Sequence, residues 1–212
     1  VSCEHTTRSL VRYDSQLDRH VLASSTNGYV LNSPNDVVVR GSDGEIFFTD
    51  PPFGVRLDDG ELAVYQQAME YGACGVFRVT NDPGAPEAVT MKLFRPNGLC
   101  FSVGEDRLYV SDSSDDYHSV YAFPVVNGVV TDEPELFAEI DAGVPDGMRV
   151  DEENRLYVAT LEGVQVFASD GKKIGLIPVP EMVTNLTFGG PNKDELYITA
   201  TKSLYRIRMN TK

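Results

Sequence analysis

The chain has 212 residues, 42% of them hydrophobic and 24% charged, with a formal net charge of -14 at pH 7. This composition is typical of a globular protein with enough residues for a sizeable core, and the acidic excess argues against nucleic acid or an anionic membrane as a partner. The three cysteines are odd in number and lack metal-binding spacing, so we expect reduced thiols. No signal segment is visible, and we therefore favour a cytoplasmic location.

Four related segments follow one another along the chain, and each combines a small polar start, a short apolar strand, a polar turn and a second strand. We expect the second strands to begin at Ile46, Leu108, Leu156 and Leu196, with a third and often a fourth strand after each. The apolar alternation has a period of two, and no long stretch has a helical period. The four segments read SPNDVVVRGSDGEIFFTD, RPNGLCFSVGEDRLYVSD, VPDGMRVDEENRLYVAT and VTNLTFGGPNKDELYITA.

Repeated units of four short antiparallel strands, at roughly 40 to 50 residues each, are typical of β-propeller blades. We therefore expect an all-β chain with one propeller domain over residues 1–212. VSCEH and SLVRYD, at the N-terminus, match a second and a third strand without a first. This predicts about four and a half blades, with roughly 60 to 90 further residues upstream. The insertion over residues 51–73 is expected to be a surface loop or lid.

Polar residues occupy the same position at the start of each first strand. We call Asn35, Asn97, Asp146 and Asn185 the strand-start residues. The first strand of a propeller blade lines the central channel, so the first three should converge there. Their amide and carboxylate oxygens suit a hard divalent cation, calcium first, with magnesium, manganese or zinc as alternatives. Asn185 could be a further ligand, a substrate contact or a strand-start cap.

A simpler interpretation of the Pro-Asn-Gly and Pro-Asp-Gly segments is that they are turns, with Gly98 and Gly147 at positive φ. Asp36 should face away from its neighbour Asn35, where it could fix a loop or bind a second ion. The segment SDSSDD, residues 111–116, lacks the glycine and distal glutamate of an EF-hand loop, so we expect a solvated loop there. The patterns of a serine-hydrolase elbow, a phosphate loop and an HExxH zinc helix are absent from the sequence.

Six motifs in order resemble the gluconolactonase, senescence-marker-protein (regucalcin) and luciferin-regenerating family of six-bladed propellers, in its bacterial and fungal gluconolactonase branch. The resemblance covers essentially the whole chain and implies a single divalent cation with Asn35, Asn97 and Asp146 among its ligands. In that family a further ligand is a Glu in a Glu-Gly-Pro motif, which this sequence does not contain. The motifs are NSPNDVVV, FFTDPPFG, RPNGLCFS, LYVSDS, PDGMRVD and TNLTFGG.

The resemblance also implies hydrolysis of a sugar lactone such as glucono-1,5-lactone, with Asp146 as both cation ligand and base. Two alternatives remain: another lactone or an organophosphate ester as substrate, or a calcium-binding propeller without turnover. The oligomeric state is left open. Candidate substrate contacts are Ser33 (where some relatives have an Arg), Asp50, Phe53, Asn185 and His5.

Overall fold

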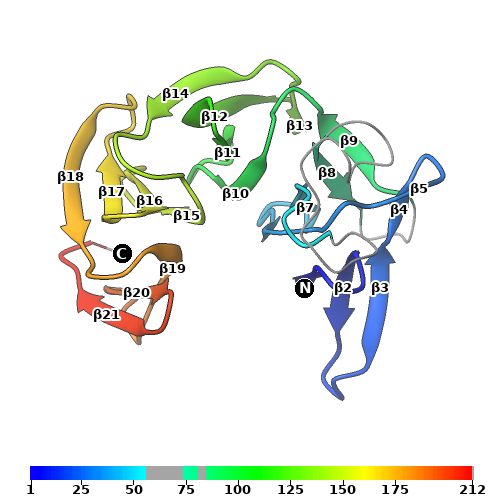
Figure 1. Cartoon of the computed structure of the whole chain (residues 1–212), viewed down its shortest axis with the longest axis horizontal. Coiled ribbons are helices and arrows are strands. Elements are labelled where there is room, and N and C mark those ends of the chain that lie inside the picture. Colours follow the sequence, from blue (N-terminus) through cyan, green and yellow to red (C-terminus); the bar gives the residue numbers. More distant parts are fainter. Residues whose placement is uncertain (56–73, 81–84, 212) are drawn as a thin grey trace. The chain divides into compact units, whose positions relative to one another are not determined.

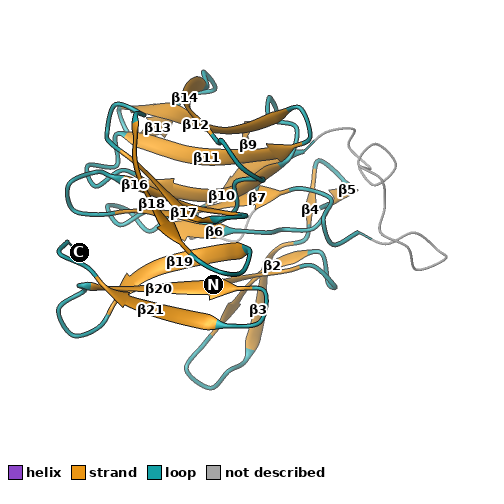
Figure 2. Cartoon of the chain, turned by 60° about the vertical axis from the view of Figure 1, so that its left-hand side comes forward, coloured by secondary structure: helices purple, strands orange, loops and turns teal. Residues whose placement is uncertain are grey.

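The computed structural model describes residues 1–55, 74–80 and 85–211. These residues form strands joined by turns and loops, and they contain no helix (Figure 2). No helix in this part of the chain is therefore long and apolar enough to cross a membrane. The chain divides into two compact units, Val1–Asn97 and Gly98–Lys212. Each unit is described by itself below.

The first unit contains two antiparallel sheets and a small hairpin (Figure 1). The N-terminal sheet has the order β1-β2-β3, as expected for a second, third and fourth strand without a first. The next sheet has the order β6-β7-β8-β9, one complete copy of the repeat. The strands are β1 (Ser2–Glu4), β2 (Ser9–Tyr13), β3 (Arg19–Ala23), β4 (Ser25–Thr26), β5 (Tyr29–Val30), β6 (Val37–Val39), β7 (Ile46–Asp50), β8 (Gly75–Val79) and β9 (Glu87–Thr90).

An apolar core lies between these two sheets. Leu10 of β2 packs in one cluster with Phe48 of β7 and Phe77 of β8. The two phenylalanine rings stack with their centroids 5.5 Å apart. β7 is buried along its whole length; its first three residues are apolar, and Thr49 and Asp50 complete it. Each fully buried side chain of this size contributes about 1.5–3 kcal/mol, so this core fixes β7, the second strand of the repeat that starts at Asn35.

The second unit contains three antiparallel sheets (Figure 1). The first has the order β10-β11-β12, with β13 and β14 both pairing with β12, and it is followed by β15-β16-β17-β18 and β19-β20-β21. The unit boundary falls within β10. The strands are β10 (Pro96–Phe101), β11 (Arg107–Ser114), β12 (Tyr117–Val126), β13 (Val129–Val130), β14 (Glu135–Glu139), β15 (Met148–Val150), β16 (Leu156–Thr160), β17 (Gly163–Phe167), β18 (Lys173–Pro178), β19 (Val183–Gly189), β20 (Glu195–Ala200) and β21 (Leu204–Arg208).

Two apolar clusters join the three sheets of this unit in succession. One unites Tyr109 of β11 with Met148 and Phe167 of the following sheet. The other unites Tyr157 of β16 with the last sheet, where its ring meets Phe188 edge-on at 5.3 Å. β16 and β17 are buried throughout, whereas the outer strand β18 alternates between half-buried and exposed residues. The repeat therefore stacks sheet upon sheet, with the middle strands covered on both faces.

The expectation of a solvated loop over residues 111–116 is wrong for its first four residues. Strand β11 extends through Ser114, and all four residues from Ser111 to Ser114 are buried. The hydroxyls of Ser111 and Ser113 are tolerated because they bond to backbone groups: Ser111 Oγ accepts from Gly98 N, and Ser113 Oγ donates to the Pro145 carbonyl. Only Asp115 and Asp116 of this run are exposed.

Of the expected insertion over residues 51–73, the structure describes residues 51–55. Residues 56–73 lie outside the described part of the chain, which resumes at Cys74. Pro51 and Pro52, at the start of this segment, are buried. The expectation of a lid therefore stays a prediction.

Candidate metal and substrate site

The first unit brings two of the three expected metal ligands into direct contact. Asn35 Nδ2 donates a hydrogen bond of 2.6 Å to Asn97 Oδ1, although the two residues are 62 positions apart. Asn35 is half-buried and Asn97 is only 6% exposed. The amide groups of two successive repeats thus lie side by side, as the shared phase of the strand-start residues predicts.

His5 lies beside the same pair. Its Nε2 is 3.2 Å from Asn35 Oδ1 and donates to that oxygen when it carries the ring proton. The residue is exposed, and it follows β1 in a turn. Gly54 packs directly on the imidazole, since a Cβ at Gly54 would lie 2.5 Å from His5 Cβ. His5 therefore borders the amide pair, and its role as a substrate contact stays a prediction.

Asp36 is placed one residue beyond Asn35 and belongs to the strand start. Its Oδ1 accepts a hydrogen bond of 2.9 Å from Val37 N, so the carboxylate caps the beginning of β6. The Asp36 carboxylate also affects Cys3. Burial foremost, and then the negative charges of Asp36 and Asp50, raise the pKa of the Cys3 thiol. The thiol therefore stays protonated at neutral pH. A second ion at Asp36 stays a prediction.

The other expected substrate contacts of this unit fix the loop around Pro51. Ser33 is fully buried, and its hydroxyl donates to Pro51 O at 2.6 Å and accepts from Gly54 N at 2.9 Å. Asp50 is also fully buried and accepts a hydrogen bond of 2.7 Å from Asn32 N. Phe53 is half-buried in the same loop. These contacts give Ser33 and Asp50 a structural role, which the sequence did not indicate.

Asp146, the third expected ligand, lies in the second unit, two residues before the start of β15. Its N–H donates to Ala159 O at 3.0 Å, which begins the pairing of β15 with β16. Its carbonyl oxygen accepts a hydrogen bond of 3.2 Å from the Ser111 hydroxyl of β11. The residue is half-buried. Both neighbouring strands therefore fix the backbone from which the carboxylate projects.

Gly147 packs against Asn185, so that this unit brings together the last two strand-start positions. A Cβ on Gly147 would lie 2.3 Å from Asn185 Cγ, and a Cβ on Gly98 would lie 2.3 Å from the Asp146 carbonyl oxygen. Neither glycine has a positive φ. The turn interpretation is therefore wrong: glycine is required here because the next repeat approaches too closely for a side chain.

Asn185 is the third residue of β19, just after a shift in its register with β20, and its Oδ1 accepts a hydrogen bond of 2.8 Å from Leu186 N. Its side chain lines a hollow of about 420 Å³ between Arg149 of β15 and the last sheet. Asn185 therefore lies inside the strand and not at its first residue, and its contact with cation or substrate stays a prediction.

The donor set fits a hard cation in its chemistry. The adjacent amides of Asn35 and Asn97 offer neutral oxygens, and Asp146 offers a carboxylate, which are ligands that calcium and magnesium prefer. No group of three or more His, Cys, Asp or Glu side chains is arranged for a metal within the described residues. The proposed ligands Asn35 and Asn97 would bind a cation through amide oxygens, which do not belong to such a group.

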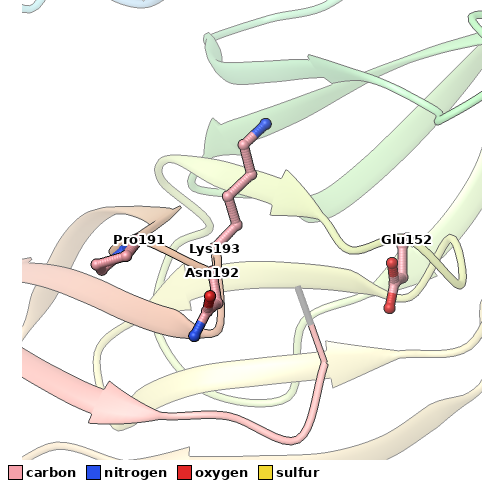
Figure 3. A pocket seen from close by; sticks show the side chains of 4 residues that line it. All are labelled: Glu152, Pro191, Asn192 and Lys193. Carbon is pink, nitrogen blue, oxygen red and sulfur yellow. The ribbon is translucent and has the colours of Figure 1, made fainter.

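A different hollow of the second unit lies at the opposite ends of the strands. It has a volume of about 630 Å³, with Glu152 from the β15–β16 turn on one side and Pro191, Asn192 and Lys193 from the β19–β20 turn on the other (Figure 3). Asp146 and Asn185 lie at the starts of β15 and β19, whereas these turns follow the strand ends. This hollow is therefore separate from the strand-start residues.

Comparison with known proteins identifies the family. The sequence profile described as the SMP-30/Gluconolactonase/LRE-like region matches residues 1–202. The chain belongs to this family. Among curated family relatives, the gluconolactonase of Zymomonas mobilis is 33% identical over 217 aligned positions, which cover 97% of this chain and 58% of that protein. This member of the SMP-30/gluconolactonase/LRE-like family thus spans less than two thirds of that relative's length.

Solved structures of the family confirm the expected fold. A gluconolactonase from Xanthomonas campestris aligns with a TM-score of 0.86 and 36% identity, covering 97% of this chain and 67% of that one. A structure from Agrobacterium tumefaciens, described as the calcium-binding protein regucalcin, aligns with a TM-score of 0.76 and 20% identity over 97% of this chain and 71% of that one. This family member is therefore an all-β propeller chain with about five blades, aligned to most of a six-bladed propeller.

Proposed function

We propose that this chain is a metal-dependent lactonase that hydrolyses a sugar lactone of the glucono-1,5-lactone type to the aldonic acid. The observation that carries the proposal is the direct contact of the Asn35 and Asn97 amides, two oxygen donors from successive repeats, in a chain of the gluconolactonase family. The similarity to the Zymomonas mobilis and Xanthomonas campestris gluconolactonases supports the choice of substrate class.

In this proposal Asn35, Asn97 and Asp146 provide the oxygen ligands of one divalent cation, with calcium favoured. When bound, such a cation supplies Lewis-acid polarisation of the lactone carbonyl. Asn35 and Asn97 would supply neutral amide oxygens as ligands. Their positions are fixed because their backbones pair within the sheet, as in the 2.9 Å hydrogen bond from Asn35 N to Thr49 O.

Asp146 would orient the attacking water and accept its proton as general base. The water oxygen then bonds to the lactone carbonyl carbon, the ring C–O bond breaks, and the ring oxygen takes the proton from Asp146 to leave as the hydroxyl of the aldonic acid. The half-burial of Asp146, with its backbone bonded to β11 and β16, suits a carboxylate that must keep one orientation. His5, whose Nε2 lies 3.2 Å from Asn35 Oδ1, would contact the sugar hydroxyls.

The experiment is a pH-drop assay on glucono-1,5-lactone, corrected for spontaneous hydrolysis and run with and without chelator. Asp146→Ala should lose more than a hundredfold in turnover while the circular dichroism spectrum is unchanged. Asn192→Ala, an exposed asparagine in the β19–β20 turn, is the matched control and should retain wild-type turnover. Unchanged turnover in Asp146→Ala, or wild-type turnover that ignores the chelator, would overturn the proposal.

A further inference from the structure

Two buried hydroxyls occupy the same position in successive repeats, at the ends of the motifs FFTD and LYVSD. Thr49 lies on β7 and Ser111 lies on β11, and both residues are fully buried. Buried hydroxyls in folded proteins are nearly always hydrogen-bonded. The groups that these two hydroxyls contact are the strand-start residues.

Thr49 joins two strand starts within the first unit. Its Oγ1 accepts a hydrogen bond of 3.1 Å from Asp36 N, the residue after Asn35. The same Oγ1 donates a hydrogen bond of 2.7 Å to the carbonyl oxygen of Asn97. One hydroxyl thus connects the backbone at one expected ligand with the backbone of the next.

Ser111 makes the same connection within the second unit. Its Oγ accepts a hydrogen bond of 2.8 Å from Gly98 N, the residue after Asn97. It donates toward the carbonyl oxygen of Asp146 at 3.2 Å, sharing its proton with Gly98 O at 3.3 Å. The hydroxyl therefore links the start of one repeat to the residue that carries the proposed catalytic carboxylate.

The third copy of the motif, LYVAT, has Ala159 at this position and lacks the hydroxyl. There the equivalent amide, Gly147 N, donates directly to Thr184 O at 2.9 Å. The connection to the next repeat is preserved, but it bypasses the second strand. The hydroxyl is thus present at the two positions that precede the expected ligands Asn97 and Asp146, and it is missing at the position that precedes Asn185.

We infer that Thr49 and Ser111 are positioning residues that set the backbone of Asn97 and Asp146 for cation binding, an inference that rests on the metal role in the proposed function. Removing either hydroxyl takes away one hydrogen bond to an N–H and one to a C=O at the strand starts, so the ligand backbone can shift. Loss of groups that orient metal ligands typically costs about 10- to 100-fold in metal affinity. Neither hydroxyl needs to touch the cation.

The test is isothermal titration of the full chain with calcium. Thr49→Val and Ser111→Ala should each weaken calcium binding about 10- to 100-fold. Thr49→Ser and Ser111→Thr keep a hydroxyl and should bind calcium with close to wild-type affinity. Thr160→Val is the matched control, because Thr160 is equally buried but its hydroxyl donates to Gly163 O within one hairpin; it should bind calcium as the wild type does.

Amide exchange in the absence of calcium gives a second readout. Faster exchange at Asp36 in Thr49→Val and at Gly98 in Ser111→Ala should accompany the lower affinity. Wild-type affinity in both hydroxyl-free variants, or a wild-type chain that binds no calcium, would overturn the inference. A wild-type chain that binds calcium with hydroxyl-dependent affinity but hydrolyses no lactone would contradict the proposed function alone and support the inference.

Discussion

The Asn35 side chain donates its amide proton to Asn97 Oδ1 at 2.6 Å, which places two residues from successive repeats in contact at the starts of their strands. Such a contact needs both backbones to be fixed, and each is paired into a sheet: Asn35 N bonds to Thr49 O, and Asn97 lies within β10. A pair of adjacent amides can bind one cation between them or, without it, bond to one another.

Asn97→Ala tests this pair directly. The change removes one proposed ligand and leaves the Asn35 amide without its partner, so calcium affinity should fall at least tenfold and the free energy of unfolding should fall by about 1–3 kcal/mol. Calorimetric titration and urea denaturation measure the two effects. Asn192→Ala, on the exposed β19–β20 turn, should change neither. Calcium affinity equal to wild type in Asn97→Ala would exclude this residue as a ligand.

Gly147 provides a prediction about the close approach of successive repeats. Gly147→Ala would place a Cβ 2.3 Å from Asn185 Cγ, so we expect a loss of about 1–3 kcal/mol in the free energy of unfolding and a displaced Asn185 side chain. Gly175→Ala is the control, because Gly175 has open space around its Cβ position and no positive φ. That variant should be neutral or slightly stabilised in thermal denaturation. Equal stability of the two variants would contradict the steric explanation.

The strands could be predicted from the sequence because their pattern is local and repeats. The expected strand starts at Ile46 and Leu156 are confirmed, and those at Leu108 and Leu196 lie one residue inside the observed strands. The reason that position 98 requires glycine could not be predicted from the local pattern, because it is the close approach of the Asp146 carbonyl oxygen in the next repeat. Sequence position alone gives the phase of a residue but not its distance from another repeat.

Polar residues near the site show the same limit. The polar neighbours of Ser111 predict a solvated loop, yet its hydroxyl bonds to backbone groups of Gly98 and Asp146. The motifs predict Ser33 and Asp50 at the substrate, whereas both are fully buried and Ser33 bonds to Pro51 O, a contact that the local sequence does not reveal. One signal was present in the sequence: a hydroxyl residue recurs at the same point of FFTD and LYVSD.

The N-terminal sheet makes a prediction about pH. Glu4 of β1 accepts hydrogen bonds from Arg19 Nη2 at 2.7 Å, from Thr7 Oγ1 at 2.5 Å and from Tyr13 OH at 2.6 Å. The Arg19 bond foremost, with those from Thr7 and Tyr13, lowers the pKa of Glu4 from 4.5 to about 2. Because the folded pKa lies below the ordinary value, ionised Glu4 stabilises the sheet above about pH 4.5, and this contribution is lost as the pH falls toward 2.

Carboxyl-carbon NMR titration should therefore show a Glu4 pKa of about 2, below the 4.5 of an ordinary glutamate. Glu4→Gln should remove its contribution to the decrease in stability between about pH 4.5 and 2, without changing the structure near neutral pH. A Glu4 midpoint near 4.5 would show that the hydrogen bonds to Arg19 and Tyr13 do not persist in solution.

Calcium itself should raise the thermal stability of the chain. A ligand that binds only the folded state at 100 times its Kd adds about 2.7 kcal/mol, so chelation should lower the midpoint of thermal unfolding by several degrees. Asn35→Ala should show a much smaller difference between calcium and chelator, because one of the two adjacent amide ligands is gone. Scanning calorimetry at constant ionic strength, with sodium chloride replacing calcium, separates specific binding from charge screening of this acidic chain. Identical midpoints for the wild type with calcium and with chelator would rule out a cation site of useful affinity in this chain.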